Sequence, residues 1–288
     1  MTIHVPVLPR EVLEWLQPSP GQVFVDGTLG GGGHTRLLAE RVGDAGRIVA
    51  LDRDPLAVAA AETSLRGLPV SVATASYADF GEILDEIGIK LIDGLLLDLG
   101  LSSDQLASGD RGFSFDSEGP LDMRYNPTEG DPAWRLLERL PADDLANLIY
   151  RYGEERCSRR IAKAIVDSRR ERPVKTSRDL AELVRRCVPR AKDRIDPATR
   201  TFQALRIAAN NELGELERVL KLAPQRLRTG GRIAIISFHS LEDRIVKEAF
   251  RENELLRPLT KKPLLAGDEE LAANPRSRSA KLRVAERV

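Results

Sequence analysis

The segment VFVDGTLGGGGH, residues 23–34, decides the fold of this chain. Three apolar residues lead into Asp26, four glycines follow at 30–33, and a helix-compatible run continues from Thr35 to Arg41. Glycine suits a tight turn from a strand into a helix because it adopts backbone angles that other residues tolerate poorly. It also carries no Cβ to hold the backbone away from a bound adenosine group. The segment therefore predicts a nucleotide-cofactor loop at the end of a strand.

A second acidic residue ends the next apolar run. The run from Arg47 to Leu51 leads into Asp52, twenty positions after Gly32. A carboxylate at the tip of a second strand is well placed to accept hydrogen bonds from a ribose diol. The alternative is a structural glycine turn that binds nothing, but four glycines together with two strand-tip aspartates favour binding.

The same loop restricts the cofactor. A phosphate-binding P-loop needs Lys and then Ser or Thr after its last glycine, whereas this chain has His34 and Thr35 after Gly33. The dinucleotide fingerprint, started at Gly30, would place Thr35 at its third glycine. S-adenosylmethionine has no pyrophosphate, and its ammonium and sulfonium groups suit the carboxylate of Asp26. We therefore expect S-adenosylmethionine as the cofactor.

Composition limits the class of protein. The chain has 288 residues, 42% of them hydrophobic, which is enough for a large buried core. Its formal net charge is zero, so a uniformly basic nucleic-acid binder is excluded. The two cysteines lack C-x-x-C spacing, and the N-terminus has no long apolar stretch. We expect a cytoplasmic globular protein with no membrane anchor.

Strand and helix patterns alternate through the first third of the chain, which predicts an α/β fold with a parallel sheet covered on both faces. The expected strands are 23–25, 48–51, 70–73 and 94–97. After Asp98 the alternation stops, and residues 131–200 read as several helices broken at prolines. A strand pattern returns at 232–237, after a long helix expected over 205–222. The simplest account is a helical insertion in a sheet domain.

The expected insertion is basic. Residues 151–200 hold sixteen lysines and arginines against eight acidic residues, a net charge of +8. Such helix faces neutralise phosphates in nucleic-acid binders, although ordinary solvated helices also carry them. The arginine-rich faces comprise Arg156, Arg159, Arg160, Lys163, Arg169, Arg170 and Arg172. A basic C-terminal run at 274–283 adds Arg276, Arg278, Lys281 and Arg283, which favours a polyanionic substrate.

With S-adenosylmethionine, the expected chemistry is in-line displacement at the methyl group, driven mostly by positioning. Cys157 and Cys187 both fall in the insertion, away from the strand tips, so a thiolate-assisted attack on carbon is disfavoured. An exocyclic amine is a poor nucleophile and needs an acceptor for its N–H as the nitrogen becomes tetrahedral. Asp98, followed by Ser102 and Ser103, is the candidate acceptor; the alternative is that Asp98 only contacts the cofactor or caps a loop.

Other residues have two interpretations each. His34 is expected to orient the cofactor, and His239 either lines the substrate side or caps a helix. No metal-type histidine spacing is present in the sequence, so we expect no metal site. Tyr77 is placed to pack on adenine, while Phe113 and Phe115 either stack on a base or anchor their loop to a core.

With these residues assembled, the chain resembles the bacterial small-subunit rRNA cytosine-N4 methyltransferase family, known as RsmH or MraW. The resemblance runs nearly end to end and rests on long motifs. They are HVPVL at 4–8, DGTLGGGGH at 26–34, LDRDP at 51–55, LLDLGLSSDQL at 96–106, RGFSF at 111–115, GPLDMR at 119–124, RTFQALRIAANNEL at 200–213, ISFHSLEDR at 236–244 and NPRSRSAKLR at 274–283.

The resemblance implies a Rossmann-like class I methyltransferase with a seven-stranded, mostly parallel sheet and an inserted all-helical domain. The implied domains are 1–106 with 207–288 for methyl transfer, and 107–206 for the insertion that faces RNA. The implied activity is N4-methylation of a cytidine in the decoding centre of small-subunit (16S) rRNA, at position 1402 in the usual rRNA numbering. The implied partner is the small ribosomal subunit, and a homodimer is one option for the assembly.

Carried over position by position, the cofactor contacts are Gly32, Gly33, His34, Asp52, Tyr77, Asp98 and Gln105. For catalysis we name Asp98, Ser102 and His239 as candidates, since the resemblance does not settle which residue acts as a base. Two other functions remain open. A DNA amino-methyltransferase would carry an Asn- or Ser-Pro-Pro-aromatic motif after the fourth strand, where this chain reads DLGLSS. A non-catalytic cofactor-binding assembly factor would share the loop and lack methyl transfer.

Overall fold

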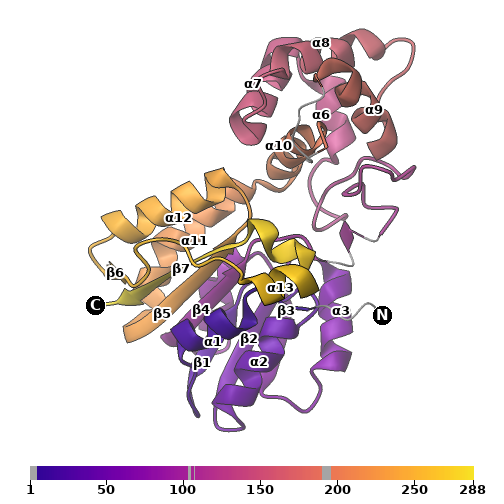
Figure 1. Cartoon of the computed structure of the whole chain (residues 1–288). Helices are drawn as coiled ribbons and strands as arrows, with labels where there is room; N and C mark the ends of the chain where they lie inside the picture. The colour runs from indigo at the N-terminus through magenta and orange to yellow at the C-terminus, as the bar shows by residue number, and fades with distance from the viewer. Residues whose placement is uncertain (1–4, 103–104, 107, 190–195) are drawn as a thin grey trace. The chain divides into compact units, whose positions relative to one another are not determined.

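The computed structural model describes residues 5–102, 105–106, 108–189 and 196–288. Seven strands form one sheet in the order β3-β2-β1-β4-β5-β7-β6 (Figure 1). Strands β1 to β5 pair in parallel, whereas β7 runs antiparallel to both β5 and β6. The predicted α/β class with a mostly parallel sheet is therefore confirmed. The strands are β1 Val23–Asp26, β2 Arg47–Asp52, β3 Val70–Thr74, β4 Ile92–Asp98, β5 Leu227–Ser237, β6 Leu256–Pro258 and β7 Lys281–Arg287.

Helices cover both faces of this sheet because the inner strands are apolar on both sides. On β1, Phe24 packs into the cluster that contains α1, α2 and α3, while Val25 packs into the cluster that contains α4, α11 and α12. The helices around the sheet are α1 Pro9–Leu16, α2 Gly33–Val42, α3 Pro55–Ser64, α4 Phe80–Glu86, α11 Glu212–Arg226, α12 Ser240–Glu252 and α13 Asp268–Ala273, with 3-10 turns η1 Tyr77–Asp79 and η2 Pro275–Ser279.

The strand order reverses beside β1. Connections from β1 lead outward to β2 and β3 on one side, and β4 and β5 lie on the other side of β1. In open α/β sheets, ligands bind outside the carboxyl ends of the strands at the point where the order reverses. That point lies between β1 and β4, whose last residues are Asp26 and Asp98.

The chain divides into two compact units, of which the sheet unit comprises 1–102 and 213–288 and the second comprises 103–212. The second unit is built of helices (Figure 1). In its described part, apolar side chains such as those of Ile149, Ile161 and Leu205 are buried. Its helices are α6 Ala133–Arg139, α7 Ala142–Gly153, α8 Ser158–Ser168, α9 Ser177–Cys187 and α10 Thr199–Asn210.

The RGFSF loop is anchored within this helical unit. The ring of Phe113 is 6% exposed and stacks on Tyr125 at 6.0 Å, and Phe115 meets Phe202 edge-on at 4.7 Å. Of the two interpretations of these phenylalanines, the structure shows the anchoring one.

One sequence-based expectation about the elements was wrong, and one segment forms an element that had not been assigned. The long helix expected over 205–222 is two helices, because Asn211 adopts the left-handed conformation (φ 52°) and ends α10 before α11 begins. The C-terminal residues 281–287, read as part of a basic run, form strand β7. Arg283 in that strand is 7% exposed and donates to Asp243 at 2.6 Å, and Lys281 lies 3.6 Å from the same carboxylate. These two cations therefore stabilise the sheet unit and do not form a free basic surface.

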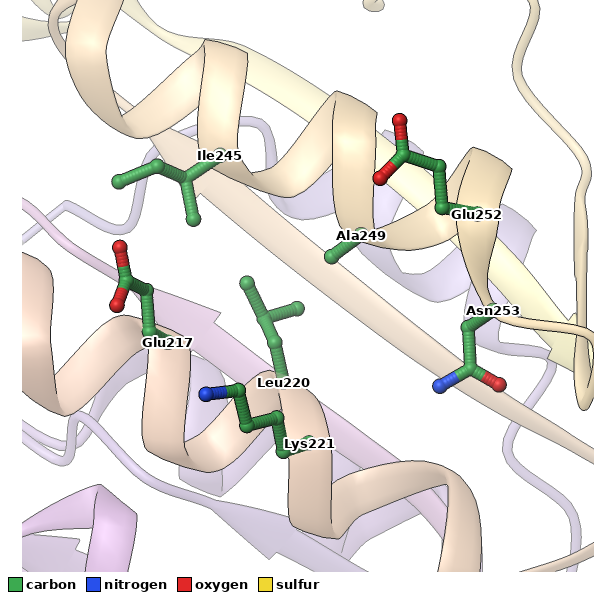
Figure 2. Close-up of a pocket in the computed structure, with 7 residues that line it drawn as sticks. All are labelled: Glu217, Leu220, Lys221, Ile245, Ala249, Glu252 and Asn253. Atoms are coloured by element: carbon green, nitrogen blue, oxygen red, sulfur yellow. The ribbon is translucent and has the colours of Figure 1, made fainter.

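A groove with a volume of about 290 Å³ lies between α11 and α12 on the sheet unit (Figure 2). Apolar side chains of Leu220, Ile245 and Ala249 face each other across it, with charged side chains such as Lys221 and Glu252 beside them. Helix α12 starts at the carboxyl end of β5, so its far end lies roughly 20 Å from the strand tips at 1.5 Å per residue. The lining of the groove includes none of the residues at the ends of β1 and β4. No helix in the described ranges is both long and apolar enough to cross a membrane.

Candidate active site

The Asp26 side chain, at the end of β1, holds the glycine loop in place through hydrogen bonds. Its carboxylate is 1% exposed, with one oxygen accepting from Thr28 N at 3.1 Å and the other accepting from Thr35 Oγ1 at 2.6 Å. Burial raises the pKa of Asp26, and the hydrogen bonds from the two threonines oppose that effect. The carboxylate therefore holds the loop to the start of α2, while the expected contact with a cofactor ammonium group stays a prediction.

The glycine loop itself is fixed by backbone hydrogen bonds to the neighbouring strands. Leu29 N donates to Leu51 O at 2.8 Å, and Gly30 N donates to the Asp52 carboxylate at 2.8 Å. Gly30 and Gly32 have positive φ angles of 47° and 77°, and a Cβ added to Gly33 would lie 3.0 Å from the ring of Pro6. The loop therefore needs glycine for both its turns and its packing.

Asp52 stands at the end of β2 beside this loop. Its second oxygen accepts from Asp54 N at 2.8 Å, so the loop and the start of α3 both hold the side chain. Each carboxylate oxygen has two lone pairs, which leaves acceptor capacity for a ribose hydroxyl. Burial raises the pKa of Asp52 to about 6, partly opposed by these backbone hydrogen bonds.

Asp98 ends β4 next to β1. Its backbone N donates to Thr28 Oγ1 at 2.6 Å, and its carboxylate lies 3.9 Å from Nε2 of His34, which is itself buried at the start of α2. Burial raises the pKa of Asp98 to about 7, against the opposing effects of Gly100 N and Arg276. The structure thus brings Asp98 and His34 together, as the sequence-based site requires.

The remaining cofactor-side residues are placed as follows. Tyr77 in η1 packs directly on the end of β1, where a Cβ added to Gly27 would lie 2.7 Å from Tyr77 Cβ. Ser102 lies opposite the loop, since a Cβ added to Gly30 would lie 3.9 Å from Ser102 Cβ. Gln105 is buried within the helical unit 103–212, and Ser103 lies outside the described residues.

His239 caps α12. Its Nδ1 accepts from Glu242 N at 3.4 Å, and the Glu242 carboxylate accepts in turn from the backbone N of Phe238 and of His239. Such a reciprocal box satisfies amides that the first turn of a helix leaves unpaired. The capping interpretation of His239 is therefore the one the structure shows, and a catalytic role for it stays a prediction.

Sequence reasoning overlooked three residues that hold the site. Thr28 joins β1 to β4 through Asp98 N, and Thr35 joins α2 to Asp26. Arg276, from the C-terminal run, donates to the carbonyl of Leu101 just beyond β4. The threonines had a signal, since a hydroxyl two or nine residues after a strand-tip aspartate can reach its carboxylate. No local signal exists for Arg276, which is 178 positions away from Asp98.

Comparison with known proteins adds the family. The model of the MraW methylase family matches residues 1–288. The chain belongs to this family. The chain is 52% identical to Ribosomal RNA small subunit methyltransferase H of Rhodopirellula baltica, over 100% of this chain and 92% of the relative. It is also 52% identical to the protein of the same name from Deinococcus deserti, over 99% and 94%.

One solved structure with a similar fold is a Streptococcus mutans protein in complex with SAH, 12% identical, which covers 99% of this chain and 100% of that one with a TM-score of 0.46. Membership of the MraW methylase family confirms the predicted methyltransferase class and its cofactor, S-adenosylmethionine. The strand-tip edge fits that cofactor, because the Asp52 carboxylate beside the glycine loop is an acceptor with capacity for a ribose hydroxyl.

Proposed function

We propose that this protein methylates the exocyclic N4 amine of a cytidine in the decoding centre of small-subunit rRNA. The names of the relatives support an rRNA substrate of the small subunit. The observation that carries the choice of an amine is Asp98, a buried carboxyl group with a pKa near 7 at the end of β4, beside the glycine loop. No cysteine of the chain lies in the sheet unit, which disfavours thiolate-assisted carbon methylation.

Each residue in the proposal has a physical role. S-adenosylmethionine supplies an electrophilic methyl group. Asp52 accepts from the ribose and Tyr77 packs on the adenine, so the methyl carbon is fixed in one direction. Asp98 accepts a hydrogen bond from the incoming amine and takes that proton as the nitrogen–carbon bond forms, while the methyl–sulfur bond breaks and its electron pair stays on sulfur. His34, beside Asp98, orients the cofactor. Ser102 and His239 line the part of the site that receives the substrate.

We assign methyl transfer to the domain 1–106 with 207–288 and RNA contact to the inserted domain 107–206. Helix α8 supports the second assignment. Its first turn holds Arg159 and no acidic residue, and Arg156 lies just before it, with both side chains exposed. Cations near a helix N-terminus oppose the helix dipole and cost about 0.3–1 kcal/mol each, so they suit a surface that meets phosphates. The proposed partner is the small ribosomal subunit in the cytoplasm.

The test is methyl transfer from tritiated S-adenosylmethionine to small subunits that lack the modification, followed by mass spectrometry of the methylated nucleotide. We expect one methyl group on one cytidine, at N4. Methylation of duplex DNA with none on rRNA would favour a DNA amino-methyltransferase. Cofactor binding without methyl incorporation into any substrate would favour a non-catalytic assembly factor. Either result would overturn the proposal.

Asp98→Asn tests the acceptor role. Asparagine keeps the shape and loses the negative charge, so we expect the rate of methyl transfer to fall by roughly 10²-fold or more. A wild-type rate for Asp98→Asn at saturating substrate would contradict the acceptor role, and circular dichroism would verify that the variant is folded.

A further inference from the structure

The C-terminal turn η2 reaches the candidate active site with one arginine. Asn274 and Ser277 anchor this turn, with 7% and 1% of their surfaces exposed, and Ser277 Oγ donates to Asn274 O at 2.8 Å. The Asn274 amide also donates to the carbonyl of Val5 at 3.4 Å. Held in this way, the half-buried Arg276 side chain donates to the carbonyl of Leu101, three residues after Asp98.

Arg276 is the cation among the charged groups that act on Asp98. Asp26 on β1 and Glu242 on α12 are acidic and raise the pKa of Asp98, as burial does, whereas Arg276 lowers it. His34 on α2 also lies beside Asp98, with its Nε2 at 3.9 Å from the carboxylate. Burial lowers the pKa of Arg276 and the charge of Asp98 opposes that effect, so the two residues influence each other.

We propose that Arg276 is a positioning residue of the methyl-transfer site, which fixes the backbone after β4 through Leu101 and favours the charged form of the Asp98 carboxyl group. A charged carboxylate accepts hydrogen bonds more strongly than a protonated carboxyl group, which would present a donor instead. The role of Arg276 thus rests on the proposed function, in which Asp98 accepts an amine N–H. It also explains why a side chain from the C-terminal run is half-buried at the strand tips.

The test measures the ionisation of Asp98 directly. The carboxyl carbon of Asp98 is followed by ¹³C NMR in aspartate-labelled full-length protein, assigned with Asp98→Asn, and the pH dependence of methyl transfer is recorded in parallel. Removing the cation in Arg276→Gln should raise the titration midpoint of Asp98 by roughly one pH unit. The acidic limb of the rate profile should move in the same direction.

Conservative and control variants separate charge from structure. Arg276→Lys keeps the cation, so the midpoint should stay within a few tenths of wild type, while kcat falls several-fold because an ammonium cannot reproduce the guanidinium fork. Arg278→Gln removes an exposed arginine from the same turn and should leave the Asp98 midpoint and cofactor affinity unchanged. If Arg276→Gln does not fold, Arg276→Met keeps the aliphatic stem and removes the charge.

An unchanged Asp98 midpoint in folded Arg276→Gln or Arg276→Met would overturn the proposal. An equal shift in Arg278→Gln would also overturn it, because the effect would then be general. The titration is read on the free protein, so it is independent of any RNA substrate. Absence of methyl transfer by the wild-type enzyme would instead overturn the proposed function, while the titration still decides the electrostatic role of Arg276.

Discussion

At the scale of single residues, three aspartates at strand ends take different roles because their surroundings differ. Asp26 is 1% exposed, with hydrogen bonds from two threonines, and so holds the loop. Asp52 accepts from backbone amides of the glycine loop and of the start of α3, whereas Asp98 lies among charged groups from three other elements. Identical side chains at equivalent strand ends are thus divided between a structural role, the proposed binding of the cofactor and the proposed chemistry.

Asp52→Ala should weaken S-adenosylmethionine binding by roughly 10- to 150-fold, because a hydrogen bond to a charged group contributes about 1.5–3 kcal/mol. Titration calorimetry measures the loss. Asp44→Ala changes an exposed aspartate between α2 and β2 and serves as the matched control. Equal affinities for wild type and Asp52→Ala would contradict the ribose assignment.

Cofactor binding should depend on pH through Asp52. Its folded pKa of about 6 exceeds the ordinary value of 3.8, so between those values the folded protein binds more protons than the unfolded chain. Asp52 therefore lowers the free energy of unfolding of the protein as pH rises from about 3.8 to about 6. A ribose hydroxyl donates to the ionised form, so binding should release protons near pH 6 and weaken below it. Calorimetry in buffers of different ionisation enthalpy would detect the release, and identical heats in all buffers would argue against it.

At the scale of elements, the end of β4 and the turn η1 pack closely against Gly27, directly after β1, so a side chain at that position would displace them. A Cβ on Gly27 would lie 2.5 Å from Leu97 Cδ2 and 2.7 Å from Tyr77 Cβ. Gly27 N also donates to Leu96 O at 2.9 Å, which ties the two strands together at their ends. The adenine side of the proposed site is therefore coupled to the central strand pair.

Gly27→Ala should lower the free energy of unfolding by about 1–3 kcal/mol, because an extra methyl group in a full site forces its neighbours to move. It should also weaken cofactor binding through the displacement of Tyr77. Denaturant unfolding and calorimetry measure the two effects. Gly109→Ala is the control, since a Cβ there has nothing within 4 Å. If both alanine variants behave alike, the coupling between Gly27 and Tyr77 is not supported.

At the scale of the whole molecule, a chain of zero net charge separates its charges by region. The segment 151–200 carries a net +8, yet several of its cations are already paired, as Lys163 is with Asp167 and Arg185 is with Asp196. Arg169 donates to carbonyls near the end of α6, so it stabilises the helical unit. The exposed arginines at the start of α8 are the stronger candidates for phosphate contact.

The double variant Arg156→Gln, Arg159→Gln should weaken binding to small subunits and reduce the salt dependence by roughly 0.7 in slope for each lost contact. Cofactor affinity should stay at the wild-type value, because neither arginine is among the proposed cofactor contacts. The double variant Arg135→Gln, Arg139→Gln is the control, since both arginines pair with Asp131 at 3.0 and 2.7 Å. Filter binding across a salt series would refute the assignment if both double variants lost affinity equally.

The sequence by itself determined the α/β class, the glycine loop and the strand-tip acidic residues. These features are local. An apolar run that ends on Asp52, or four glycines before a helix, predicts the same element whichever partners that segment packs against. The motifs further supported the family. Local patterns could not separate capping from catalysis for His239, because both interpretations need the same residue at the same position.

Only the tertiary structure decided the rest. Strand β7 exists because residues 281–287 pair antiparallel with β5 and β6, and pairing over such separations leaves no local pattern. The break at Asn211 replaced a helix that apolar periodicity would have continued. Arg283 became part of the core through Asp243, and Arg276 came to Asp98 across 178 positions. Charge in a sequence is only a count, and its effect on a pKa depends on which groups folding brings close and removes from water.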